Sequence, residues 1–223
     1  MASYVTIVAA IEEACSRIVY PFQQGGDGRI NSANDERGYL ERLKSELLAS
    51  DPTMNIQIAP IRFWYDLSIN GLPIDLKLTN GTKDNAFSLK AIIYTLTGAT
   101  IKRRMSLNEM WVQCKSSLKS TRDPMTEYHY LVVNKNTNKF IFRSLMDINT
   151  YGTNPSNTLQ INWKKEFEVP KNTMLYDDKV VALLSAIQTS VKQKMDSMNT
   201  FASSDIEQTL RGERSLPPRA VQL

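Results

Sequence analysis

The chain has 223 residues and a formal net charge of +4, from 27 basic and 23 acidic side chains. Its 42% hydrophobic and 22% charged residues are typical of a globular protein and exclude a disordered or collagen-like chain. No apolar run is long enough for a membrane span, and the first residues lack the basic region of a signal peptide. Two cysteines cannot form a disulfide framework. We therefore expect a cytoplasmic protein with its own core, and the mild positive charge favours a polyanionic partner.

Apolar residues at helical spacing predict two helices at the start of the chain. The first is expected over residues 3–20, and the second from an N-cap at Asn34 or Asp35 to about residue 49. The apolar stripe of the first helix consists of Val5, Val8, Ile11, Cys15 and Ile18. The pattern then changes to the alternation of β-strands, which we expect over residues 55–59, 62–69 and 72–79.

The second half of the chain predicts further helices and strands. Helices are expected over residues 85–96, 106–118 and 177–197, and strands over 128–133, 139–143 and 158–163. The Asn-rich segment 149–157 is expected to be a loop. We predict one α/β (α+β) domain over residues 1–200, with a central mixed, largely antiparallel β-sheet flanked by helices. The tail over 201–223 is expected either to be mobile or to reach a partner.

Residues 62–79 form the most informative segment, a predicted β-hairpin. Asn70-Gly71 lies between two strand patterns and is typical of a type I′ turn, because both central residues of that turn need positive φ. Counting outward from the turn places Asp66 directly opposite Asp75. One face of the ribbon is then apolar, with Phe63, Tyr65, Leu67, Ile69, Leu72, Ile74, Leu76 and Leu78. The other face holds Trp64, Asp66, Ser68, Pro73, Asp75, Lys77 and Thr79.

Two aspartates at facing strand positions need a physical explanation, because like charges repel there and aspartate is a poor strand former. A divalent cation between Asp66 and Asp75 would remove the repulsion, and two carboxylates completed by water suit Mg²⁺. Lys77 lies two residues beyond Asp75 on the same face, where its ammonium can position water or neutralise a phosphate oxygen. The alternative is a solvated polar face, which is the commoner situation for any one of these residues.

The spacing of these residues matches a known signature. Asp66, eight intervening residues and then Asp75-Leu76-Lys77 fit the D…(D/E)xK pattern of the PD-(D/E)XK nucleases. The surrounding sequence, with Ile74, Phe87-Ser88-Leu89 and Tyr94-Thr95, resembles the blunt-cutting type II restriction endonucleases of the EcoRV and HincII kind. The resemblance covers about residues 62–98, with a weaker similarity over 159–163. Tyr65 departs from the pattern, since a proline often precedes the first aspartate.

The resemblance implies a restriction-endonuclease-like fold and a homodimer that cuts double-stranded DNA at a short palindrome, giving blunt ends with 5′-phosphates. It implies Mg²⁺ as cofactor, with Mn²⁺ as a substitute, held by Asp66 and Asp75 while Lys77 assists the attacking water. Such sites commonly include a helix glutamate, for which Glu36 and Glu41 are both candidates. A cognate DNA methyltransferase is expected in the same system, because self-DNA must be protected.

Two groups of residues are candidates for holding and reading DNA. Basic side chains contact phosphates, and those proposed here are Lys102, Arg103, Arg104 and Lys119. The resemblance implies a base-reading segment near residues 149–165, where Gln160, Asn162 and Lys164 alternate with apolar residues. Asparagine and glutamine pair with adenine in the major groove. The alternatives are a solvated basic face and an edge strand with a polar outer side.

Other functions stay open. A junction-resolving or repair nuclease of the same fold would use the same carboxylates, and a non-catalytic DNA-binding protein would need none of them. The sequence has no Gly-rich phosphate loop, so a nucleotide cofactor is not expected. The only histidine, His129, lies between two tyrosines in a predicted strand and is expected to be structural.

Overall fold

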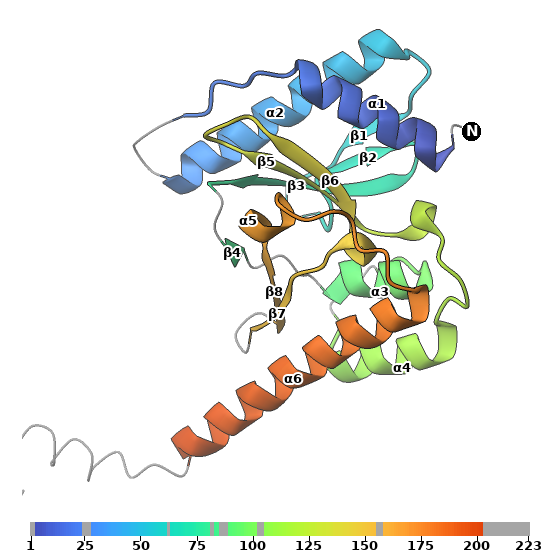
Figure 1. Cartoon of the computed structure of the whole chain (residues 1–223), viewed down its shortest axis with the longest axis vertical. Helices are drawn as coiled ribbons and strands as arrows, with labels where there is room; N and C mark the ends of the chain where they lie inside the picture. Colours follow the sequence, from blue (N-terminus) through green and yellow to red (C-terminus); the bar gives the residue numbers. More distant parts are fainter. Residues whose placement is uncertain are drawn as a thin grey trace, which may run out of the picture.

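The computed structural model describes residues 3–23, 28–61, 63–80, 83–84, 89–101, 105–154 and 158–202. A five-stranded sheet with helices on both sides forms the centre of the molecule (Figure 1). In spatial order its strands are β1 (Ile56–Ile58), β2 (Leu67–Ile69), β3 (Leu72–Thr79), β5 (His129–Asn134) and β6 (Phe140–Ser144). Only β3 and β5 pair in parallel, so the prediction of a mixed, largely antiparallel sheet is confirmed.

A second, three-stranded antiparallel sheet lies beside the first. It consists of β4 (Lys83–Asp84), β8 (Thr158–Asn162) and β7 (Tyr151–Asn154), in that order. The prediction of a loop over 149–157 is therefore wrong for residues 151–154, which form β7, and residues 155–157 lie outside the described residues. A contact with the last helix stabilises β7, because the backbone N–H of Asn154 donates to Oγ of Ser190 over 2.9 Å.

Six α-helices and two 3₁₀ helices complete the part of the chain that the structure describes. The α-helices are α1 (Tyr4–Arg17), α2 (Gly28–Ser50), α3 (Leu89–Thr97), α4 (Leu107–Ser117), α5 (Trp163–Glu166) and α6 (Tyr176–Ala202). The 3₁₀ helices are η1 (Pro124–Thr126) and η2 (Leu145–Asp147). No helix within these described ranges has the length and apolar character that a bilayer crossing requires.

Helix α1 begins after Ser3, whose hydroxyl accepts from the backbone N–H of Thr6 over 3.2 Å. Its buried stripe includes Ile11 and Cys15 as predicted, whereas Val5 is 75% exposed because the helix is turned to bury Ile7 instead. The predicted stripe is therefore wrong at its first position.

Helix α2 starts earlier than the predicted cap. Asp35 lies inside the helix, where it is buried and its carboxylate accepts from the backbone N–H of Gln23 over 3.1 Å. The same carboxylate pairs with Lys135 over 2.9 Å. Asp35 therefore fixes the helix to the segments around it rather than capping it.

One glycine of α2 makes a close approach possible. A Cβ atom at Gly38 would collide with the hydroxyl of Tyr20. The Tyr20 ring is itself held by Phe22 and Tyr39, with ring centroids 5.0 and 5.8 Å away. Only glycine at residue 38 thus allows α2 to lie this close to Tyr20.

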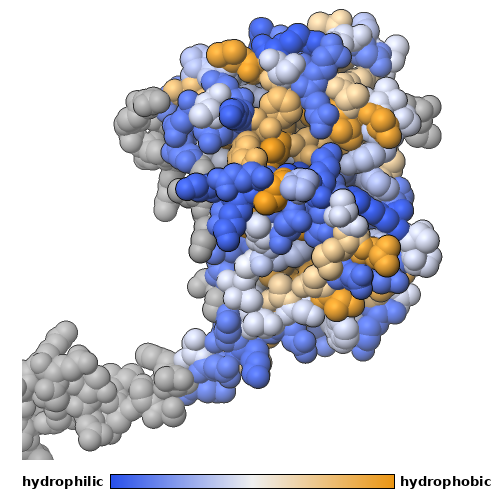
Figure 2. Space-filling model, in the orientation of Figure 1, coloured by the Kyte–Doolittle hydropathy of each residue, from blue (hydrophilic) through white to orange (hydrophobic). Residues whose placement is uncertain are grey.

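The five-stranded sheet separates two apolar cores. Helices α1 and α2 cover one face of the sheet, and α3 and α4 lie on the other side (Figure 1). Leu72, Ile74 and Leu76 of β3 belong to the first core, and Tyr128, Tyr130 and Trp163 belong to the second. On the face drawn in Figure 2, hydrophobic side chains form small separate patches among hydrophilic ones. The two faces of β3 therefore meet different surroundings, apolar on the α1–α2 side and more varied on the other.

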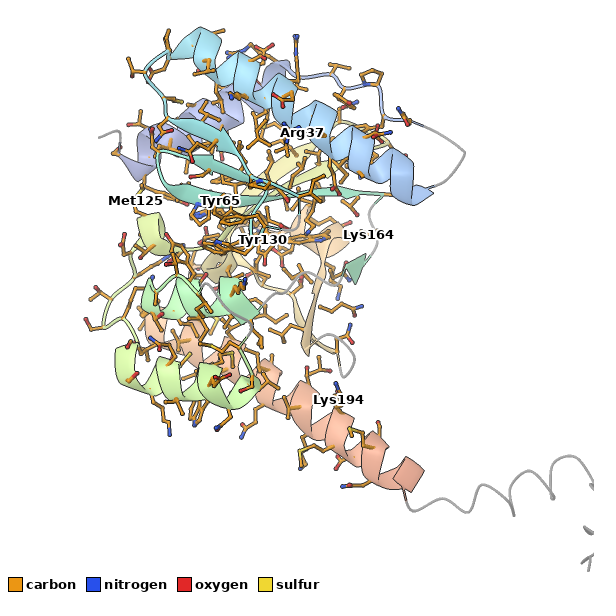
Figure 3. All side chains as sticks on the ribbon, turned by 180° about the vertical axis from the view of Figure 1, so that it is seen from behind. Arg37, Tyr65, Met125, Tyr130, Lys164 and Lys194 are labelled. Carbon is orange, nitrogen blue, oxygen red and sulfur yellow. The ribbon has the colours of Figure 1, made fainter. Side chains whose placement is uncertain are left out.

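Helix α6 extends beyond the rest of the molecule. Its first half packs against β7 and β8, while its second half projects away from the sheets and includes Lys194 (Figure 3). Residues 192–199 are all exposed.

Candidate active site

The hairpin between β2 and β3 has the predicted turn and register. Asn70 and Gly71 have φ of 50° and 88°, as a type I′ turn requires. Leu67 faces Ile74 and Ile69 faces Leu72, the pairs obtained by counting outward from the turn. Strand β3 also has the predicted bounds, residues 72–79. The sequence therefore predicts this half of the hairpin residue by residue.

Beyond Leu67 the ladder is interrupted. The backbone N–H of Asp66 donates to the carbonyl of Ile74 over 2.9 Å, so Asp66 and Asp75 do not form the predicted directly facing pair. In a regular ladder the N–H of Leu76 would donate to the carbonyl of Tyr65. Here it donates to Oδ2 of Asp66 over 2.8 Å. The Asp66 carboxylate therefore replaces a backbone acceptor at the edge of β3, an irregularity typical of strands beside functional sites.

The same interruption redirects the aromatic residues before Asp66. Phe63 and Tyr65 were expected on the apolar face with Leu67, and this prediction is wrong. Phe63 is 47% exposed, and Trp64 and Tyr65 pack against the second core. Strand β2 is consequently shorter than the predicted 62–69.

Asp75 and Lys77 lie on one face of β3, as their spacing predicts. The Lys77 Nζ atom is 2.6 Å from Oδ2 of Asp75. Oδ1 of Asp75 accepts from the Tyr128 hydroxyl over 3.0 Å, and that hydroxyl also lies 2.8 Å from the carbonyl of Trp64. Both carboxylate oxygens of Asp75 therefore have partners that fix the orientation of the group.

Asp66 experiences opposing effects on its ionisation. Burial, followed by the negative charge of Asp75, raises the pKa of Asp66 to about 7, although the Leu76 N–H and the Lys77 ammonium act in the other direction. The two aspartates therefore lie close enough for the charge of Asp75 to disfavour ionisation of Asp66. A cation between them would relieve this repulsion, so the pair fits an oxygen-liganded divalent metal.

The structure distinguishes the two candidate glutamates. Glu36 on α2 is half-buried, and its negative charge contributes to the raised pKa of Asp66. Glu41 pairs with Arg37 over 2.8 Å on the exposed side of the helix. Within the described ranges, no three Asp, Glu, His or Cys side chains come together as a metal-binding group. Glu36 thus acts on Asp66 through its charge at longer range, whereas Glu41 is engaged elsewhere.

The predicted phosphate-contacting residues are only partly described. Lys102, Arg103 and Arg104 lie outside the described residues. The Lys119 ammonium donates to the hydroxyl and the carbonyl of Thr126, over 3.1 and 3.3 Å, and burial lowers its pKa. In this structure Lys119 therefore fixes the segment leading to β5.

The predicted base-reading segment is a strand followed by a short helix. Leu159, Ile161 and Trp163 are fully buried, which confirms the expected apolar side. Asn162 ends β8 and caps α5, because its Oδ1 accepts from the backbone N–H of Lys165 over 3.2 Å.

The polar side of this segment is shorter than expected. Lys164 is exposed but belongs to helix α5, so its predicted alternation with Gln160 and Asn162 is wrong. Gln160 is half-buried in β8, opposite Gly152 of β7. Gln160 and Asn162 lie on the same side of the strand.

Sequence reasoning missed Tyr128 as part of the site. Its hydroxyl reaches Asp75 because β5 pairs with β3 in parallel, placing Tyr130 beside Asp75. No local pattern around residue 128 indicates this pairing, which joins segments 53 positions apart. The neighbouring His129 is structural as expected, since it is fully buried and stacks on Phe142, with ring centroids 5.3 Å apart.

Comparisons with known proteins give no relative: no protein-family model matches the sequence, and no curated protein or solved structure is significantly similar to it.

Proposed function

We propose that this protein is a Mg²⁺-dependent endonuclease of double-stranded DNA, with the restriction-endonuclease-like fold that its PD-(D/E)XK motif implies. The observation that supports the proposal most is the proximity of Asp66, Asp75 and Lys77: Lys77 pairs with Asp75, and the charges of both act on Asp66. Two carboxylates that repel each other beside a lysine form a site for a divalent cation and a phosphodiester.

Asp66 and Asp75 would hold the cation, which when bound lowers the pKa of a water ligand and offsets negative charge on the phosphate. The Lys77 ammonium, fixed beside Asp75, would orient the attacking water or donate to a phosphate oxygen. Tyr128 fixes the orientation of Asp75 through its hydroxyl. Glu36 would be the helix glutamate of the site, because its charge reaches Asp66 while Glu41 is paired with Arg37.

The finer parts of the proposal follow from the same resemblance. A homodimer would cut a short palindrome, because two-fold symmetry presents one site to each strand. Gln160 and Asn162 are the proposed base-reading residues, and Lys164 belongs to the same DNA-contacting segment. The proposed phosphate contacts are Lys102, Arg103, Arg104 and Lys119. The proposal also includes blunt ends as the product and Mn²⁺ as a substitute metal. It further includes a companion DNA methyltransferase.

The test is plasmid cleavage by the wild type, by Asp75→Asn and by the control Glu41→Gln, with Mg²⁺ or with EDTA. We expect discrete fragments from the wild type and the control with Mg²⁺ only, and none from Asp75→Asn. Circular dichroism checks that both variants fold. Cleavage by folded Asp75→Asn at the wild-type rate would contradict the assignment of the site.

The same experiment separates the alternative functions. A smear, or a preference for branched DNA over linear duplex, would identify a junction-resolving or repair nuclease. Tight DNA binding without cleavage, with Mg²⁺ or Mn²⁺, would identify a non-catalytic DNA-binding protein.

A further inference from the structure

A cavity of about 620 Å³ is lined by Tyr65, the residue before Asp66, and by Pro73, two residues before Asp75. Four aromatic side chains contribute to its walls, and we call it the aromatic pocket, defined by Phe63, Trp64, Tyr65, Tyr94, Lys90 and Pro73. This volume lies within the range of sites that bind small organic groups. Figure 3 shows Tyr65 in the layer between the five-stranded sheet and helices α3 and α4.

Two structural links connect the aromatic pocket to the carboxylates. Pro73 is two residues before Asp75 on β3, so both lie on the same face of the strand. The Tyr128 hydroxyl lies 2.8 Å from the carbonyl of Trp64 and 3.0 Å from Oδ1 of Asp75. The pocket wall and the proposed metal site thus share one hydrogen-bonding group.

The rings of the pocket contact one another and leave part of their surface accessible. The rings of Phe63 and Tyr65 meet edge to face with centroids 4.7 Å apart, and the ring centroids of Trp64 and Tyr94 are 5.1 Å apart. Phe63 is nevertheless 47% exposed, so part of its ring is available to a ligand. Lys90 adds an ammonium to the lining, which suits a ligand that has both a flat ring and an anionic group.

We propose that the aromatic pocket receives an unstacked nucleobase next to the phosphate that is cut. The proposal rests on the nuclease function above and adds a feature to it. A base that remains paired within a duplex cannot enter a lateral cavity, so it must either leave the helix or belong to a single strand. Aromatic rings hold such bases by stacking, without reading their sequence.

The test compares Phe63→Ala with Trp111→Ala in an Asp75→Asn background, because Asp75 does not line the pocket. Trp111 is a matched control, because it lies on α4 and is also 47% exposed. We expect Phe63→Ala to weaken the binding of mixed-sequence oligonucleotides about ten-fold, as the loss of one stacked base predicts. Trp111→Ala should bind like the parent protein.

A second measurement locates the base. Oligonucleotides containing iododeoxyuridine are photocross-linked to the Asp75→Asn protein, and the cross-linked peptide is identified by mass spectrometry. We expect attachment at Phe63, Trp64 or Tyr65. Attachment with both duplex and single-stranded probes means that a base leaves the duplex, and attachment with the single strand alone means an unpaired substrate.

The proposal is overturned if cross-links form only outside the pocket, if none form, or if Phe63→Ala and Trp111→Ala bind equally well. Its failure is distinct from that of the nuclease function. Metal-dependent plasmid cleavage with no cross-link at residues 63–65 rejects the base pocket alone. A cross-link there without cleavage by the wild type rejects the nuclease alone.

Discussion

A hydrogen bond joins Asp66 to Leu76, from the backbone N–H of Leu76 to Oδ2 of Asp66 over 2.8 Å. It holds the carboxylate at the edge of β3, where burial and the charge of Asp75 act against its ionisation. These effects outweigh the hydrogen bond and raise the pKa of Asp66 to about 7. The metal-free protein is therefore expected to have a carboxylate whose charge changes near neutral pH.

Asp66→Asn should stabilise the metal-free protein at alkaline pH. The pKa of this carboxyl is about 7 in the folded protein against an ordinary 3.8, so between these values the folded protein keeps a proton that the unfolded chain releases. Wild-type stability therefore falls as pH rises through this window, by at most about 1.4 kcal/mol per pH unit. Thermal melts in EDTA should show a melting-temperature advantage of Asp66→Asn that grows from pH 4 to pH 7 and then levels off. An advantage that does not vary with pH would contradict the raised pKa.

Mg²⁺ affinity should depend on pH through the same group. Binding requires the ionised carboxylate. As the pH rises toward 7, the dissociation constant for Mg²⁺ should therefore fall by up to about ten-fold per pH unit, and above pH 7 it should become constant. Calorimetric titrations from pH 5.5 to 8.5 measure this, with Asp66→Asn as the control without the group. A constant affinity over this range would exclude Asp66 as the titrating ligand.

Tyr128→Phe should slow cleavage, because it removes the hydroxyl that holds the Asp75 carboxylate in position. The expected loss is about ten-fold in kcat, typical of groups that hold a metal ligand. Tyr4→Phe is the matched control, since its hydroxyl lies 3.2 Å from Nε2 of His129. Both variants should lose about 1 kcal/mol of unfolding free energy, but only Tyr128→Phe should change kcat and the Mg²⁺ dependence.

Glu36→Gln and Glu41→Gln should differ although both lie on α2. Removing the Glu36 charge should lower the pKa of Asp66 and shift the pH dependence of Mg²⁺ binding toward acid. Cleavage should fall about ten-fold in Glu36→Gln, as expected for a group that supports metal ligands. Glu41→Gln removes only a surface pair with Arg37 and should behave like the wild type. Equal effects of the two substitutions would remove Glu36 from the site.

Asn162 has a structural role that must be separated from base reading. Asn162→Ala should cost about 1 kcal/mol, because it removes the cap of α5. Asn162→Asp keeps the capping oxygen but lacks the amide donors that adenine recognition needs. If Asn162 reads a base, the aspartate variant should melt like the wild type and fail to cut the wild-type sites. If Asn162→Asp cuts the same sites as the wild type, then Asn162 caps α5 and does not read a base.

Local patterns in the sequence predict much of the site and miss its long-range parts. Strand β3 and the relation of Asp75 to Lys77 follow from period-two alternation and the Asn70-Gly71 turn, both of which act over a few residues. The interruption at Asp66 is not predictable in this way, since a side chain there replaces a backbone acceptor. The position of Tyr128 depends on the parallel pairing of β3 with β5, which are separated in the chain by β4, α3, α4 and η1.

Element boundaries fail for related reasons. Strand β7 has the turn-forming residues Gly152 and Asn154, and its contact with Ser190 of α6 fixes it as a strand. Helix α2 begins before Asn34 and Asp35, because Asp35 makes tertiary contacts and does not cap the helix. Tertiary contacts thus override local preference in both cases.

The absence of a side chain at Gly38 has an effect two positions away. An alanine there would push α2 off the Tyr20 ring, which Phe22 and Tyr39 prevent from yielding. Glu36 would move with the helix, so the addition of one methyl group at Gly38 would shift the Glu36 carboxylate relative to Asp66. A substitution at Gly38 is therefore expected to act on the site through the position of α2, without changing any group of the site itself.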